Sequence, residues 1–95
     1  MTDGLAEFRR RIDECDERLV RLINERLKAC QEVGDFKSER GMSVRFPERE
    51  QEVISKALGL NEGPCPPDVV EKIFRILIDT AVALEENQDT ARPEK

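Results

Sequence analysis

Apolar residues recur at alternating spacings of three and four along the first part of the chain. The stripe consists of Leu5, Phe8, Ile12, Cys15, Leu19 and Leu22. This spacing places its members on one face of an α-helix. The segment contains no proline, and Gly34 is its only weak point. The pattern therefore predicts one long helix over residues 4–39.

Two later segments also carry a helical pattern, and stretches rich in glycine and proline separate the three. The breaks span residues 41–47 and 59–67. Pro47 suits the first turn of a helix, and an apolar stripe follows it at Val53, Ile54, Ala57 and Leu58. A broader apolar face runs from Val69 to Val82. We expect a short helix over 47–59, a medium one over 67–86, and a polar C-terminal tail over 87–95.

These elements predict an all-α fold in one domain spanning residues 1–95, with an ordered core over about 4–86. A helix of about 35 residues is about 50 Å long. A compact chain of 95 residues has a radius of gyration of only about 12–13 Å. Two shorter helices cannot cover the whole apolar stripe of such a helix. We therefore expect an intertwined homodimer in which both subunits contribute long helices.

Composition narrows the chemistry that the chain can perform. It contains no histidine, so it has neither a Ser-His nor a Cys-His nucleophile pair and no imidazole metal ligand. Its three cysteines lie far apart, which predicts no zinc site and fits reduced thiols in the cytoplasm. The net charge of −5 disfavours nucleic acid as a partner. No basic stretch followed by an apolar core opens the sequence, so we expect no secretory signal, and no apolar run approaches the roughly 20 residues that a membrane helix needs.

Two cations continue the apolar face of the long helix. Arg26 and Lys37 are eleven residues apart, which places them about 20° apart around the helix axis. Cys30 and Val33 lie between them on the same face. Two interpretations stay open at this point. The cations either extend into solvent from the rim of the stripe or flank a small apolar floor that accepts an anion.

Carboxylates occupy similar positions on the other two helices. Glu85 continues the face of Ile78 and Ala81, and Glu50 precedes Val53 at an inward-facing spacing beside Arg49. Fraying would explain Glu85, and compensation of the helix dipole would explain Glu50. Arg9 is 17 residues from Arg26, about 25 Å along one helix. The two arginines could share a small ligand only across a dimer.

A resemblance to a known family rests on four segments within residues 5–86. They read LAEFRRRIDECDERLVRLINER, EVGDFK, PEREQEV and KIFRILIDTAVALEE. In this order and spacing the chain resembles the all-helical chorismate mutases, small intertwined dimers of the shikimate pathway that serve aromatic amino acid biosynthesis. The resemblance implies an isomerase that converts chorismate to prephenate by a Claisen rearrangement. That reaction needs no cofactor, metal or covalent intermediate.

The resemblance also implies roles for individual residues. Arg9, donated by the partner subunit, and Arg26 would grip the substrate's two carboxylates, with Arg49 as a third candidate. Lys37 and Glu85 would face the ether oxygen from opposite sides, so that the implied catalytic residues are Lys37, Glu85 and Arg26. Glu50 would contact the ring hydroxyl. The apolar lining would consist of Val33, Ile78, Ala81 and Val82.

Two positions depart from the family pattern. Phe46 stands where some members have aspartate near the substrate hydroxyl, and Ala81 stands where some have serine. Fewer polar groups would then read the substrate ring. Two related enzymes stay open as alternatives: an isochorismate-pyruvate lyase and a 4-amino-4-deoxychorismate mutase. An alternative of another class is a catalytically silent helical dimer that binds a partner protein, although such a module would not need this set of charged residues.

Overall fold

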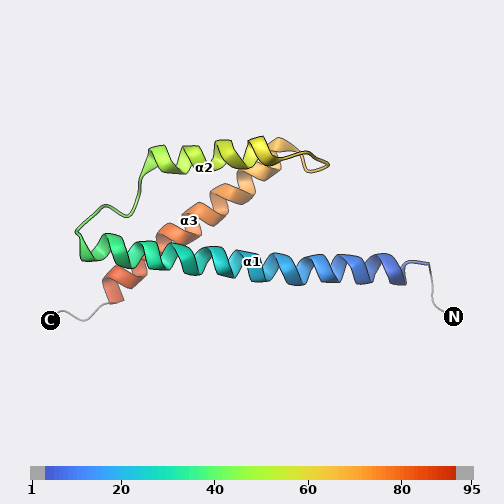
Figure 1. Ribbon diagram of the computed structural model, residues 1–95, viewed down its shortest axis with the longest axis horizontal. Helices are drawn as coiled ribbons and strands as arrows, with labels where there is room; N and C mark the ends of the chain where they lie inside the picture. Colours follow the sequence, from blue (N-terminus) through green and yellow to red (C-terminus); the bar gives the residue numbers. More distant parts are fainter. Residues whose placement is uncertain (1–3, 92–95) are drawn as a thin grey trace.

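The computed structural model describes residues 4–91, with side chains described as far as Asn87. Three helices make up this part of the chain: α1 (Ala6–Glu39), α2 (Pro47–Leu60) and α3 (Pro67–Ala91) (Figure 1). No strand occurs within it. The all-α fold with one long, one short and one medium helix is thus confirmed.

The helix boundaries follow the glycine and proline residues of the sequence, except that one helix is longer than expected. Pro47 and Pro67 each open a helix, and α1 passes Gly34 without a break. The third helix continues to Ala91, into the stretch expected to be a polar tail. Residues 87–91 contain neither glycine nor proline, so nothing in their sequence ends the helix before the approach to Pro93. Residues 92–95 lie outside the described residues.

A glycine in the left-handed conformation ends α1. Gly41 has φ of +64°, and its N–H donates to the carbonyl of Ser38 at 3.2 Å. The N–H of Met42 donates to the carbonyl of Lys37 at 2.8 Å. These two bonds form the Schellman motif, which satisfies carbonyls that the last turn leaves without a helical partner. The chain therefore reverses direction one turn after Lys37.

Helix α3 holds the fold together because it packs against both α1 and α2 (Figure 1). The buried apolar side chains belong to α2 and α3: Ile54, Ala57, Ile78, Ala81 and Val82. The molecule measures 64 × 29 × 14 Å, and its radius of gyration is 17.6 Å. It is thus an open, flat arrangement rather than a closed bundle.

The apolar stripe of α1 lies on the surface of the single chain. The N-terminal part of α1 runs past the ends of α2 and α3 (Figure 1). Leu5, Phe8, Ile12, Leu19 and Leu22 are each at least half exposed, between 52% and 61%. Scattered exposed leucines are ordinary, but a continuous stripe of large apolar side chains is not. The three helices of one chain leave this face uncovered.

The charged and polar residues are spread over all three helices. No helix among residues 4–91 is both long and apolar enough to cross a membrane.

Replacing Gly41 with alanine should lower the free energy of unfolding by about 1 kcal/mol, because a side chain is unfavourable at a positive φ. No atom lies within 4 Å of the added Cβ, so steric contact contributes nothing. Gly59 is the matched control, since it lies within α2 and is equally open. Gly59→Ala should raise stability by about 0.5–1 kcal/mol. Thermal or urea unfolding followed by circular dichroism measures both, and equal signs would contradict the assignment.

Candidate functional site

A cavity of about 260 Å³ lies between the three helices, beside the connection from α1 to α2. Each helix contributes one stripe of side chains, and the connection contributes two more residues. The lining consists of Arg26, Cys30, Val33, Lys37, Val44, Phe46, Arg49, Glu50, Val53, Ile78, Ala81, Val82 and Glu85. Its apolar members form the floor, and its charged members stand around it.

Three groups hold the ammonium of Lys37 within this cavity. Its Nζ donates a hydrogen bond to the carbonyl oxygen of Val44 at 2.8 Å. It lies 4.9 Å from the centre of the Phe46 ring, within the range of a cation–π interaction. It also lies 3.5 Å from Oε2 of Glu85. The Lys37 side chain is only 15% exposed, so the cation has a fixed position with little water around it.

Glu85 is the one buried charged side chain among the described residues. It is 7% exposed and lies on the same face of α3 as Ile78 and Ala81. Oε2 has no hydrogen-bond partner in the described part of the chain. The Nζ atom of Lys37, 3.5 Å away, is close enough for an ion pair but lies beyond the usual length of a hydrogen bond. Burial raises the pKa of the Glu85 carboxyl, and the charge of Lys37 opposes this effect. A protonated Glu85 can donate a hydrogen bond into the cavity.

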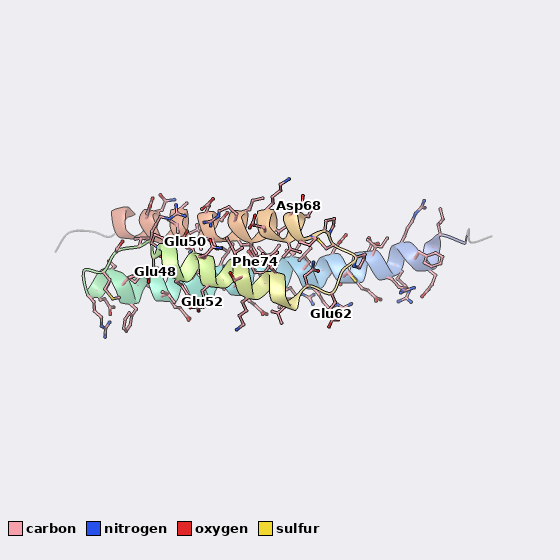
Figure 2. The ribbon with its side chains drawn as sticks, turned by 90° about the horizontal axis from the view of Figure 1, so that it is seen from above. Glu48, Glu50, Glu52, Glu62, Asp68 and Phe74 are labelled. Carbon is pink, nitrogen blue, oxygen red and sulfur yellow. The ribbon has the colours of Figure 1, made fainter. Side chains whose placement is uncertain are left out.

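Glu50 presents a second carboxylate, in the opposite electrostatic setting. It lies on the side of α2 that faces α3, away from Glu48 and Glu52 (Figure 2). Arg45 donates to both of its oxygens, at 2.9 and 3.0 Å. Arg75 of α3 donates to Oε1 at 2.8 Å. The hydrogen bonds from Arg45, and then the one from Arg75, lower the pKa of the Glu50 carboxyl, against the effect of burial.

The two arginines of the lining differ in their surroundings. The Arg26 guanidinium lies 5.9 Å from the ring centre of Phe74, and its Nη1 contacts Sγ of Cys30 at 3.8 Å. Within residues 4–87 it forms no ion pair with a carboxylate. Arg49 is 66% exposed and pairs with Glu52 at the mouth of the cavity. Arg26 thus offers its charge to the cavity more directly than Arg49 does.

The structure gathers all of the site residues named from the sequence around this cavity, with the exception of Arg9. Arg9 lies on α1, close to its start and remote from the cavity of its own chain. Three lining residues are additional: Cys30, Val44 and Val53. Helical periodicity had already placed Cys30 on the face of Arg26 and Lys37, and Val53 in the apolar stripe that follows Pro47. No periodic signal marked Val44, because it belongs to the connection between helices.

The arrangement suits a small anion with an apolar body. Arg26 and Lys37 of α1 and Arg49 of α2 supply positive charge, and Val33, Ile78, Ala81 and Val82 supply an apolar floor. The partly buried cation of Lys37 and the buried carboxyl of Glu85 face the same space, which allows two hydrogen bonds to one acceptor atom. Among the side chains of residues 4–87, no group of three or more cysteine or acidic residues is placed to hold a metal ion.

Comparisons with known proteins show the family to which the chain belongs. Residues 8–86 match the family model of chorismate mutase type II. A chorismate mutase from Methanocaldococcus jannaschii is 35% identical over 86 residues, which cover 90% of this chain and 87% of that protein. A bifunctional chorismate mutase/prephenate dehydratase from Aquifex aeolicus is 37% identical over 87 residues. The match covers 87% of this chain but only 24% of that longer relative.

The same relationship holds for the fold. The solved structure of a chorismate mutase (form II) from Thermus thermophilus superposes with a TM-score of 0.86 and 30% sequence identity. The superposition covers 92% of this chain and 99% of that one. The family model spans most of the chain, the relatives from Methanocaldococcus jannaschii and Aquifex aeolicus share 35% and 37% of the aligned sequence, and the Thermus thermophilus structure shares the fold. The chain belongs to the chorismate mutase type II family.

Proposed function

We propose that the chain converts chorismate to prephenate, and that it does so as an intertwined homodimer. The observation that carries this proposal is the placement of Lys37 and Glu85 on opposite helices, facing one cavity with an apolar floor. The rearrangement is intramolecular: an ether C–O bond breaks while a C–C bond forms, and no group leaves the molecule. The protein has to hold the reactive conformer and stabilise the charge that develops.

Lys37 would stabilise the negative charge that grows on the ether oxygen as the C–O bond breaks. The bonds from its ammonium to the Val44 carbonyl and the Phe46 ring hold it before substrate arrives. A preorganised donor does not need to reorient during the reaction, which is why such groups lower the barrier effectively. The partial exclusion of water around Lys37 strengthens the interaction further.

Glu85 would donate a hydrogen bond to the same oxygen from the opposite side. Only the protonated carboxyl can do this, because an ionised carboxylate would repel the developing charge. Burial on the apolar face of α3 favours the protonated form by raising the pKa. The buried Oε2 without a hydrogen-bond partner is consistent with a group whose partner is the substrate.

The arginines would bind the two carboxylates of the substrate. The planar fork of a guanidinium suits bidentate contact with a carboxylate. Arg26 offers this within the cavity, and Arg49 at its mouth offers a second cation. Closing the cavity over the substrate would hold its side chain above the ring and select the reactive conformer. Arg9 would complete the cage from the other subunit.

The exposed stripe of α1 supports the dimer. It presents several large apolar side chains along a helix of 34 residues, and no element of the same chain covers them. A second copy, related by a twofold axis, would cover the stripe with its own. The same packing could bring Arg9 of one subunit to the cavity of the other. The cavity is partly open in the single chain, which leaves room for such a contribution.

The direct test incubates the purified protein with chorismate, follows the ultraviolet absorbance and identifies the product by chromatography. Prephenate is the expected product. Lys37→Met should lower kcat about 10²–10³-fold, the usual effect of removing one donor to a developing oxyanion. Lys56→Met, on an exposed side of α2, is the control and should retain full activity. Pyruvate release from isochorismate, with chorismate unchanged, would instead identify the lyase.

The pH dependence of kcat tests the role of Glu85. Because the raised pKa belongs to a group that must be protonated, activity should be highest below that pKa and fall as pH rises through it. Glu85→Gln keeps a hydrogen-bond donor that does not titrate, so its profile should be flatter on the alkaline side. A variant with the same falling limb as the wild type would exclude Glu85 as the titrating group.

Subunit mixing tests whether Arg9 acts across the interface. Arg9→Ala and Lys37→Met would each be nearly inactive as homodimers. Refolding an equal mixture should form heterodimers in which one of the two sites contains both native residues. Activity should then recover to about a quarter of the wild-type value under random pairing. No recovery, despite heterodimers seen by mass spectrometry, would place Arg9 and Lys37 in the same subunit's site.

A further inference from the structure

Four charged residues form an ion-pair cluster at one edge of the cavity. Arg45 comes from the connection between α1 and α2, Glu50 from the first turn of α2, and Arg75 and Asp79 from α3. Glu50 is at the centre and is the least exposed member, with 13% of its side chain accessible. The other three are between 41% and 52% exposed. Only Glu50 among them lines the cavity.

The hydrogen bonds on Glu50 are distributed unequally between its two oxygens. Oε1 accepts from Nη2 of Arg45 at 2.9 Å and from Nη1 of Arg75 at 2.8 Å. Within the described part of the chain, Oε2 accepts only from Nε of Arg45, at 3.0 Å. Since each carboxylate oxygen can accept about two hydrogen bonds, Oε1 is saturated. Oε2 keeps one acceptor position for a donor from elsewhere.

Asp79, which does not line the cavity, joins the two arginines. Its Oδ1 lies 2.9 Å from Nη2 of Arg45 and 3.8 Å from Nη1 of Arg75. Two positive and two negative charges therefore cancel within the cluster. This matters for a dianionic substrate, because an isolated ionised Glu50 would repel it. The cluster permits a carboxylate beside an anion-binding cavity without that penalty.

We propose that Arg45 and Arg75, joined by Asp79, are positioning residues that fix Glu50 as an ionised acceptor, with Oε2 directed to the hydroxyl of the substrate ring. The proposal rests on the proposed function for its substrate. It explains how a single acceptor could recognise the ring hydroxyl in a chain that has Phe46 and Ala81 at two neighbouring lining positions. Because the arginines already hold the Glu50 carboxylate in place, no polar side chain at position 46 or 81 is needed to orient it.

Arg75 offers the sharper test of the two arginines. Arg45 lies between Val44 and Phe46, both of which contact Lys37, so its removal would also disturb that cation. Within the described part of the chain, Arg75 forms ion pairs with Glu50 and Asp79 alone. Lys72, on the same helix and 76% exposed, supplies a matched control for the loss of one positive charge.

The experiment is a double-mutant cycle on kcat/KM with Arg75→Ala, Glu50→Gln and the double variant. Arg75→Ala should lower kcat/KM about tenfold, as expected for the loss of a hydrogen bond to a charged group. In the Glu50→Gln background the same change should have an effect of less than about twofold. Lys72→Ala should change neither. Equal effects of Arg75→Ala in both backgrounds would overturn the proposal, because Arg75 would then act independently of Glu50.

The fall of activity at acidic pH, the acidic limb of the pH profile, is a second test of Arg75. A purely structural role of Arg75 would not shift the pH at which activity falls. The charged groups around Glu50 are Arg45, Arg75 and Asp79 beside it, Arg49 on its own helix, and Arg26, Lys37 and Glu85 across the cavity. Without Arg75, the pKa of Glu50 should rise toward its ordinary value. Activity should then begin to fall at a higher pH on acidification. Arg75→Lys should restore the limb in part.

A carboxyl carbon NMR titration of Glu50 separates this proposal from the proposed function. The signal should titrate below the ordinary range for glutamate in the wild type and at higher pH in Arg75→Ala. If the wild type does not convert chorismate but this shift occurs, the proposed function fails and the ion-pair cluster is supported. If chorismate is converted but neither the NMR titration nor the acidic limb moves, the cluster does not control Glu50, and the inference is wrong.

Discussion

The pairing of Lys37 with Glu85 is the interaction on which the site depends. Glu85 is buried on α3 and the Lys37 side chain on α1 is only 15% exposed, and removing an ion from water costs several kcal/mol unless it is compensated. The 3.5 Å contact between the ammonium of Lys37 and the carboxyl of Glu85 offsets part of this cost, and it exists only while α1 and α3 remain packed. The same lysine also donates a hydrogen bond to the carbonyl of Val44 and contacts the ring of Phe46, so it binds the α1–α2 connection as well. One cation therefore joins three segments of the chain at the edge of the cavity.

The two carboxyl groups of the cavity differ in the direction of their pKa shifts because their surroundings differ. Glu85 sits among apolar side chains with one cation nearby, so burial dominates and its pKa rises. Glu50 receives hydrogen bonds from two arginines, so charge dominates and its pKa falls. In the proposed reaction the same residue type would therefore serve as a hydrogen-bond donor on α3 and as an acceptor on α2. This division of roles needs neither a metal nor a histidine, the residue that the sequence lacks.

Much of the fold and most of the cavity lining could be predicted from the sequence, since both follow from helical periodicity. Arg26 and Lys37 share a face because eleven residues complete nearly whole turns, and Glu85 follows from Ile78 and Ala81 in the same way. Val44 could not be predicted, because the path of a connection depends on packing rather than on periodicity. The ion pair of Arg45 with Asp79 spans 34 residues and arises only from the crossing of α3 past α2. The extension of α3 to Ala91 was missed because the polar composition of residues 87–91 suggested a tail. No glycine or proline in that stretch ends the helix.

The unbroken course of α1 from Arg26 to Lys37 has a consequence for how such chains can change in length. Inserting one residue between these two positions would rotate Lys37 by about 100° relative to Arg26 and remove one cation from the cavity. Deleting one would do the same in the opposite sense. The connection over residues 61–66 places no charged group in the cavity and lies at the surface, where insertions are tolerated. Length variation among related chains should therefore fall in that connection and be absent from the second half of α1.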